Sequence, residues 1–274
     1  MRVVCFLVLV SFSPISFACL GQEADSLYFN GRKSRFEKLV EEAVKADVVF
    51  FGEIHDSPTA HRLQIRLAEA LIAEKKLGAI GLEMVEADDQ LLINEYLAGY
   101  IRADHLDAAA NLWPNHKSDY APLIELAKRE GLPVVATNVP RRYASLVAKE
   151  GLGALGELTA EARQYLPPLP LQVPYEQPSY KAMLEMTGHD MRANTFIEAQ
   201  ALKDATMAYR IAQFAKPGQV LFHINGSYHS DLKEGIITYL NQYRPGLRIL
   251  VISTVRPFAK EQANKGDFLL ETQN

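Results

Sequence analysis

The sequence predicts an α/β fold, a mostly parallel β-sheet flanked by helices with a small helical subdomain inserted into it. Five short apolar runs alternate with segments of helical period, which is typical of parallel strands joined by right-handed crossovers. Between the third and fourth runs, residues 140–216 carry helical patterns and no convincing strand. We therefore predict an α/β domain over residues 34–139 and 217–255, and a helical subdomain over residues 140–216.

Composition indicates a globular protein. The 274 residues are 48% apolar and 23% charged, and a chain of this length can bury a substantial core. The formal net charge is −4, from 29 basic and 33 acidic residues, and no basic block is present. This balance argues against nucleic acid as a partner.

The N-terminal residues 1–19 have the pattern of a secretory signal. One basic residue precedes the apolar run VVCFLVLV, which small residues follow; the run is too short to indicate a membrane span. Residues 16–19 (SFAC) resemble a bacterial lipobox, although Ser16 stands where Leu or Val is usual. We predict lipidation at Cys19, with plain secretion or a retained anchor as alternatives. Both cysteines, Cys5 and Cys19, lie in this segment, so no disulfide is possible within the mature fold.

Each apolar run of strand type is short and bounded by polar or helix-starting residues. The predicted strands are residues 47–52, 78–84, 132–137, 219–224 and 247–252. The predicted helices are residues 34–45, 58–75, 86–97, 120–129, 141–149, 180–186, 190–215 and 232–242. A capping box at Ser34 and Glu37 and the pair Ser57-Pro58 indicate two of the helix starts. Residues 20–33 are predicted to be a polar connector, and residues 256–274 a frayed polar tail.

Polar side chains follow three of the predicted strands. The first strand ends in Gly-Glu53-Ile-His55, the second in Gly-Leu-Glu83, and the fourth continues into Gly-Ser-Tyr-His229. The carboxyl ends of parallel strands lie at one edge of a sheet, so we expect Glu53, His55, Glu83 and His229 to converge. Such a set could bind a divalent transition metal through His55, Glu83 and His229, or act as a metal-free acid–base site.

Several of these polar residues also have purely structural interpretations. Glu83 could cap the following helix, and Asp56 could be an N-terminal charge on helix 58–75. His223 alternates inward between apolar neighbours and is expected to be a hydrogen-bonded core histidine, while His61 is expected on the surface. Arg141, after the third strand, suits an anionic group such as a carboxylate, although Pro140 at a helix start explains the spacing without a function.

The inserted helical region contains side chains that can ligate haem iron. Tyrosine, histidine and methionine all serve in that role. These residues are Tyr143, Tyr175, Tyr180, His189 and Met191. An aromatic-rich helix pair can equally be ordinary core. The chain has no C-x-x-C-H motif, which excludes covalent c-type haem attachment.

Taken together, the motifs resemble the ChaN family of iron-regulated, haem-binding bacterial lipoproteins. They are residues 49–56, 81–84, 138–141, 199–208 and 226–229. The family belongs to a wider group that resembles the Tiki and TraB proteases and the erythromycin esterases. The resemblance implies an outer-membrane anchor and haem held between two copies of the protein. It also implies a tyrosine ligand to iron, for which Tyr143 is the best match and His189 the second, with Arg141 nearby.

Two functional hypotheses follow. The first is a haem-binding lipoprotein of the bacterial envelope, a homodimer anchored through Cys19 and acting in iron acquisition. The second is a metal-dependent hydrolase of peptides or esters, in which Glu53, His55, Glu83 and His229 are catalytic and a metal activates water. The sequence argues against a serine hydrolase, because no G-x-S-x-G motif is present and Ser227 lacks that setting.

Overall fold

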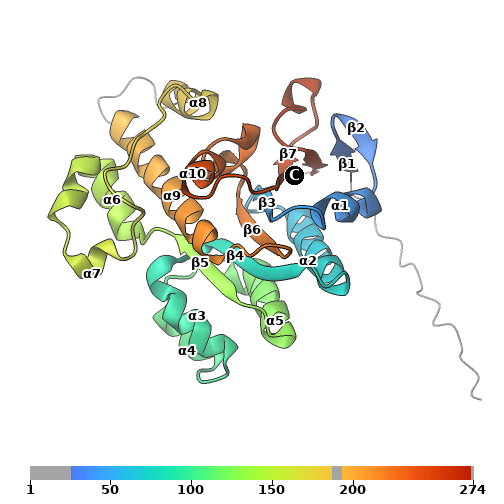
Figure 1. Cartoon of the computed structure of the whole chain (residues 1–274), viewed down its shortest axis with the longest axis horizontal. Coiled ribbons are helices and arrows are strands. Elements are labelled where there is room, and N and C mark those ends of the chain that lie inside the picture. The colour runs from blue at the N-terminus through green and yellow to red at the C-terminus, as the bar shows by residue number, and fades with distance from the viewer. Residues whose placement is uncertain (1–25, 187–192, 273–274) are drawn as a thin grey trace, which may run out of the picture.

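The computed structural model describes residues 26–186 and 193–272, and within them an eight-stranded sheet forms the centre of the molecule (Figure 1). The strands lie in the order β2-β1-β8-β7-β3-β6-β4-β5. Their bounds are β1 Ser26–Phe29, β2 Arg32–Ser34, β3 Val48–Glu53, β4 Leu77–Glu86, β5 Val134–Asn138, β6 Val220–Gly226, β7 Ile249–Val255 and β8 Phe268–Glu271. The strands from β8 to β5 pair in parallel, so the predicted fold class is confirmed. The predicted signal, Cys19, His189 and Met191 lie outside the described residues.

Helices cover both faces of the sheet. The helices are α1 Phe36–Ala43, α2 Pro58–Ala73, α3 Gln90–Leu97, α4 Ala103–Ala109, α5 Ala121–Glu130, α6 Arg141–Glu150, α7 Ala160–Arg163, α8 Pro178–Met186, α9 Ala193–Phe214 and α10 Ile236–Tyr243. On β3, Val49 and Phe51 pack with α1, α2 and α5, while Val48 and Phe50 pack with α9 and α10. This alternation explains why the strand is apolar at successive positions, since both of its faces are buried.

Of the two helix starts predicted from local signals, one has the expected structure. Ser57 caps α2, because its Oγ accepts a hydrogen bond from the backbone N–H of Ala60 at 3.3 Å. Gly131 ends α5 in the left-handed conformation, with φ of 66°. The prediction of a capping box at Ser34 was wrong. Ser34 is the last residue of β2, and Arg35 is the N-cap of α1 and makes no side-chain capping hydrogen bond.

The segments at the two ends of the described chain are strands, which corrects two predictions. The part of the predicted connector that is described contains β1 and β2, and the predicted frayed tail contains β8. Strand β8 lies between β1 and β7, and Phe268, Leu269 and Leu270 are buried there. A four-residue strand is too short to show a clear period, and one of its two pairing partners, β1, lies more than 200 residues away in the chain.

Between β5 and β6, the described residues form helices and short turns but no strand. Figure 1 shows α6, α7 and α8 at the end of the molecule opposite β1 and β2. Helix α9 packs on the sheet along one part of its length and on α6 along another, where Tyr143, Val147 and Leu202 form a small separate core. No helix in the described ranges has the length and apolar character that crossing a membrane requires.

Strand connectivity makes the carboxyl ends of β3 and β6 a topological switch point. The crossover after β3 runs through α2 on one face of the sheet, and the crossover after β6 runs through α10 on the other face. Since β3 and β6 are neighbours, their chains separate to opposite faces at their carboxyl ends. Ligands of open α/β sheets bind at such a switch point.

Candidate functional site

The first component of the candidate site is a carboxylate–imidazole pair at the end of β3. Nδ1 of His55 lies 2.8 Å from Oε1 of Glu53, and the hydroxyl of Tyr120 donates to the same oxygen at 2.6 Å. Nε2 of Gln64 donates to Oε2 of Glu53 at 2.5 Å, and Nε2 of His61 lies 3.4 Å from that oxygen. The side chain of Glu53 is fully buried, whereas that of His55 is 40% exposed, so His55 is the solvent-facing member of the pair.

These contacts set the charge states of the pair. Burial disfavours the charged form of Glu53, but hydrogen bonds from His55, His61, Tyr120 and Gln64 lower its pKa to about 2. Burial lowers the pKa of His55, but the hydrogen bond to Glu53 and the charges of Glu83 and Glu53 outweigh it and raise that pKa overall. Glu53 is therefore a fixed anion that orients His55 and favours its protonated form.

The second component is His229, which lies between two buried carboxylates. Its Nδ1 is 2.5 Å from Oδ1 of Asp204, and its Nε2 is 3.2 Å from Oε1 of Glu83. Burial lowers the pKa of His229, but the charges of Glu83 and Asp204 prevail and raise it to about 10. Burial also raises the pKa of Asp204, so the Asp204–His229 pair retains its proton far above the pH at which a free histidine loses it.

The two components meet at Gly226, the last residue of β6. Its backbone N–H donates to Oε2 of Glu83 at 2.7 Å. A Cβ atom at this position would lie 2.7 Å from Nε2 of His55 and 3.8 Å from Oε2 of Glu83, so only glycine lets the imidazole approach this closely. The structure thus brings Glu53, His55, Glu83 and His229 together at one edge of the sheet. Glu83 lies inside β4, which extends three residues beyond it, so it does not cap a helix.

The predicted metal ligands are not arranged as a metal site. Among the described residues, no group of three or more His, Cys, Asp or Glu side chains is placed to hold a metal ion. Both ring nitrogens of His229 face carboxylates, Asp204 at 2.5 Å from Nδ1 and Glu83 at 3.2 Å from Nε2. Glu83 likewise directs its two oxygens to His229 and to the N–H of Gly226.

Of the two other histidines, His223 lies where it was predicted and His61 does not. His223 is a core histidine as expected, since Nδ1 donates to Oδ1 of Asn225 at 3.0 Å and Nε2 accepts from the hydroxyl of Thr137 at 2.9 Å. Burial lowers its pKa to about 4. The prediction that His61 lies on the surface was wrong, because His61 is buried beside Glu53. Asp56 is exposed and pairs with Arg256 at 2.6 Å.

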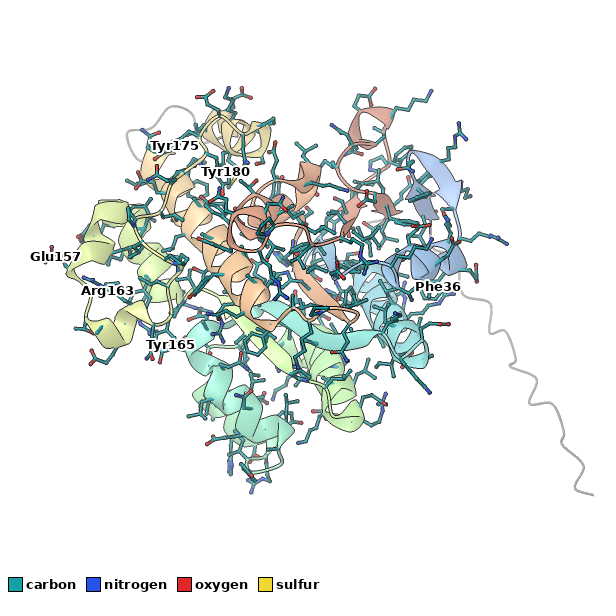
Figure 2. The ribbon with its side chains drawn as sticks, in the orientation of Figure 1. Phe36, Glu157, Arg163, Tyr165, Tyr175 and Tyr180 are labelled. Atoms are coloured by element: carbon teal, nitrogen blue, oxygen red, sulfur yellow. The ribbon has the colours of Figure 1, made fainter. Side chains whose placement is uncertain are left out.

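The residues predicted to hold haem lie beyond the third strand of the prediction, now β5. Nε of Arg141 is 2.5 Å from Oε1 of Glu86, a buried carboxylate at the end of β4. Tyr143 is only 9% exposed, and the guanidinium of Arg142 lies 4.5 Å from the centroid of its ring. Tyr175 and Tyr180, labelled in Figure 2, come from the segment around α8 and bond to carboxylates on α9. Tyr180 donates to the second oxygen of Asp204 at 2.7 Å.

Asp204 is the main site residue outside the predicted set. It lies on α9 four residues after Gln200, whose Nε2 is 3.1 Å and 3.3 Å from the two ring nitrogens of His229. Positions four apart share one face of a helix, so α9 presents both polar groups to the same ring. The sequence signal that could have identified Asp204 is its position as a charged residue among alanines that are buried, Ala201, Ala205 and Ala208.

A pocket of about 340 Å³ opens beside His55. Its apolar wall is formed by Trp113, Pro114 and Val139, and the centroid of the Trp113 ring is 4.8 Å from that of His55. Its polar lining comes from the ends of β4 and β5 and from α6 and α9. These residues are Glu86, Asn138, Arg141 and Lys203.

Comparison with a solved ChaN structure shows the same fold. ChaN of Campylobacter jejuni, described as binding haem cofacially, superposes with a TM-score of 0.71 and 19% identity over 90% of this chain and 96% of that chain. The erythromycin esterase EreC H289N in its open conformation gives a TM-score of 0.47 and 16% identity over 80% of this chain and 72% of that one.

Sequence comparison identifies the family. Protein RETICULATA-RELATED 5, a chloroplast protein of Arabidopsis thaliana, is 25% identical over 139 residues, which is 48% of this chain and 19% of that protein. This chain therefore spans less than a fifth of that relative. A family described as "Haem-binding uptake, Tiki superfamily, ChaN" has a sequence model that matches residues 39–240, which is most of the chain. The chain belongs to the ChaN family of haem-binding uptake proteins in the Tiki superfamily.

Proposed function

We propose that this protein is a haem-binding lipoprotein of the bacterial envelope that acts in haem and iron uptake. The observation that carries the proposal is its membership of the ChaN family of haem-binding uptake proteins. The sequence pattern of residues 1–19 supports export and a lipid anchor at Cys19, which would hold the chain at the outer membrane facing the periplasm or the cell surface. The haem binding described for ChaN of Campylobacter jejuni is cofacial, which supports a homodimer with haem between the two copies.

The residues present fit a haem at the carboxyl edge of the sheet. Bound haem would supply an iron centre, and a tyrosine oxygen of this chain could ligate that iron. Tyr143 is largely buried under Arg142, whereas Tyr228, between β6 and His229, is 60% exposed. We therefore add Tyr228 as the ligand that is open to an iron centre, with Tyr143 and His189 as the ligands expected from the resemblance. Arg141 would bind a propionate.

A hemin titration tests this proposal. Residues 20–274 are titrated with hemin while the Soret band is recorded, and a saturable shift is expected. The titration is repeated with Tyr228→Phe, Tyr143→Phe and His189→Ala, and the variant that lacks the iron ligand should lose or shift the band. Tyr100→Phe is the control, because Tyr100 is an 83% exposed tyrosine beyond the end of α3. A wild-type chain that leaves the hemin spectrum unchanged would overturn haem binding.

A second candidate function is metal-free hydrolysis of an ester or amide, with His55 as the general base. The observation that favours it is the geometry of His55, whose Nδ1 faces the buried Glu53 carboxylate while its Nε2 lies beside Gly226 and its side chain is 40% exposed. An imidazole oriented in this way can take a proton from water that attacks a carbonyl, and Glu53 stabilises the imidazolium that forms. His229, held positive by Glu83 and Asp204, would place a fixed charge near the developing oxyanion.

Hydrolysis of p-nitrophenyl acetate provides the test of the second function. Activity should fall by at least about a hundredfold in His55→Gln, because a positioned base contributes about that much or more. Activity in excess EDTA should be unchanged. A His55→Gln variant as active as the wild type would show that His55 is not the general base.

A further inference from the structure

We propose that the pocket beside His55 binds a small molecule that carries one carboxylate and one N–H donor on an apolar body. The pocket is the space of about 340 Å³ between Trp113, Asn138, Arg141 and Lys203. Its volume is in the range of small-molecule sites. The inference concerns this pocket itself and does not require that the protein bind haem.

Charge in the pocket favours a single anionic group. Arg141 is held in place by Glu86, which accepts its Nε–H at 2.5 Å and its backbone N–H at 3.0 Å. The lining contains two cations, Arg141 and Lys203, and the Glu86 carboxylate balances the charge of Arg141. Lys203 makes no ion pair with a described acidic side chain, so the lining carries one net positive charge. Nη2 of Arg141 donates to the backbone oxygen of Asn111 at 3.3 Å, and the other Nη N–H groups and the ammonium of Lys203 remain as donors. Carboxylate is the anion whose geometry suits a guanidinium.

Asn138 provides a second and independent indication of a ligand. It is the last residue of β5, is nine-tenths buried, and lines the pocket. Its side-chain Oδ1 is buried and accepts no hydrogen bond from any described residue. An unpaired buried acceptor is costly, because it has lost its contact with water without a replacement. A ligand N–H directed at this oxygen would satisfy it.

The apolar wall fixes the ligand relative to His55. The ring of Trp113 packs edge-on against His55, with centroids 4.8 Å apart, and against Tyr120, with centroids 6.1 Å apart. Nδ2 of Asn115 donates to the backbone oxygen of His55 at 3.2 Å, which ties the Trp113 loop to the loop after β3. A ligand whose body lies on Trp113 is therefore one side chain away from His55, which does not itself line the pocket. An N-acyl amino acid has all the required groups, namely a carboxylate, an amide N–H and an apolar acyl body.

Trp113 is also the only tryptophan of the chain, so its fluorescence reports on the pocket alone. Residues 20–274 are titrated with hippurate, and a saturable change in fluorescence is expected. The neutral methyl hippurate should bind about tenfold or more weakly, because a hydrogen bond to a charged group is lost. Lys203→Gln should weaken hippurate binding by a similar factor. Lys216→Gln is the matched control, since Lys216 is an exposed lysine past the end of α9.

Two further measurements identify the source of the carboxylate. Calorimetry with hippurate is repeated on the chain saturated with hemin: lost hippurate binding identifies a haem propionate as the occupant, and retained binding identifies a separate carboxylate ligand. Hippurate binding by a chain that does not bind hemin would sustain this inference while the proposed haem function fails. The inference is overturned if hippurate and its methyl ester bind alike, if Lys203→Gln, folded by near-UV circular dichroism, binds as the wild type does, or if no saturable change occurs.

Discussion

Nδ1 of His229 lies 2.5 Å from Oδ1 of Asp204, which joins the turn after β6 to the middle of helix α9. Because Glu83 contacts the other ring nitrogen, the imidazole is held as a cation inside the protein. This arrangement links the helical region between β5 and β6 to the edge of the sheet, and it determines what the histidine can do. A fixed cation can stabilise an anion, but it cannot act as a base or as a metal ligand.

The first prediction concerns the protonation of His229. Its pKa is raised from 6.5 to about 10, so the ring should stay protonated through pH 9. In Asp204→Asn one carboxylate is lost, and the pKa of His229 should fall. Nuclear magnetic resonance of ¹⁵N-labelled histidines over pH 5–10 measures both values. A wild-type His229 that titrates near 6.5 would show that the two carboxylates do not hold it.

The same pKa predicts a loss of stability in alkali. A pKa that is higher in the folded chain than in the unfolded chain stabilises the fold fully below pH 6.5, and the contribution disappears as pH rises through about 10. Urea unfolding of the wild type at pH 7 and pH 10 should therefore show a lower free energy of unfolding at pH 10. In His229→Gln this particular decrease should be smaller.

Acid should destabilise the chain through Glu53. Its pKa falls from 4.5 in the unfolded chain to about 2 in the fold, so its contribution is present above pH 4.5 and is lost as pH falls through 2. The shift corresponds to about 3 kcal/mol. Urea unfolding between pH 7 and pH 3 should show a shallower decline in Glu53→Gln than in the wild type. Parallel declines in the two chains would contradict the assignment.

Substitution of Gly226 should displace His55. An added Cβ would lie 2.7 Å from Nε2 of His55, and the end of a side chain can move away more easily than backbone can. We expect Gly226→Ala to cost about 1 kcal/mol in unfolding free energy but to shift the ring resonances of His55 clearly. Gly153→Ala is the control, because a Cβ there meets nothing within 4 Å. An unchanged His55 resonance in Gly226→Ala would show that the His55 ring does not lie against Gly226.

The hydrolytic function predicts a pH profile set by Glu53. Burial lowers the pKa of His55, but Glu53 and Glu83 raise it overall, so the neutral base forms at a higher pH than in a free histidine. Activity should rise with pH as His55 loses its proton. In Glu53→Gln the pKa of His55 falls, so the rise should occur at lower pH. Rates of p-nitrophenyl acetate hydrolysis over pH 5–9 decide the point, and a profile that does not move in Glu53→Gln would separate His55 from the reaction.

Sequence patterns predicted the parallel strands and the edge where their polar residues meet. Those signals are local, since a buried strand is apolar at every position and ends where polar residues begin. The predictions failed where structure depends on distant pairing. Strand β8 is recognisable only beside β1 and β7, and Tyr28 of β1 bonds to Glu271 of β8 across most of the chain.

The site was predicted incompletely for a related reason. Asp204, Gln64 and Tyr120 come from helices or their ends, and their rotation toward the site is set by tertiary packing. Without Asp204, the sequence left His229 free to bind a metal. Its partners in the fold could not be predicted from the sequence, because carboxylates on β4 and α9 face the two ring nitrogens.

The central claim is that haem binds at the carboxyl edge of the sheet, and a crystal structure of residues 20–274 with hemin tests it most directly. We expect haem at this edge, with a tyrosine oxygen bonded to iron and two copies of the chain facing each other across the cofactor. Haem bound at the opposite edge of the sheet, or iron without a tyrosine ligand, would contradict the account.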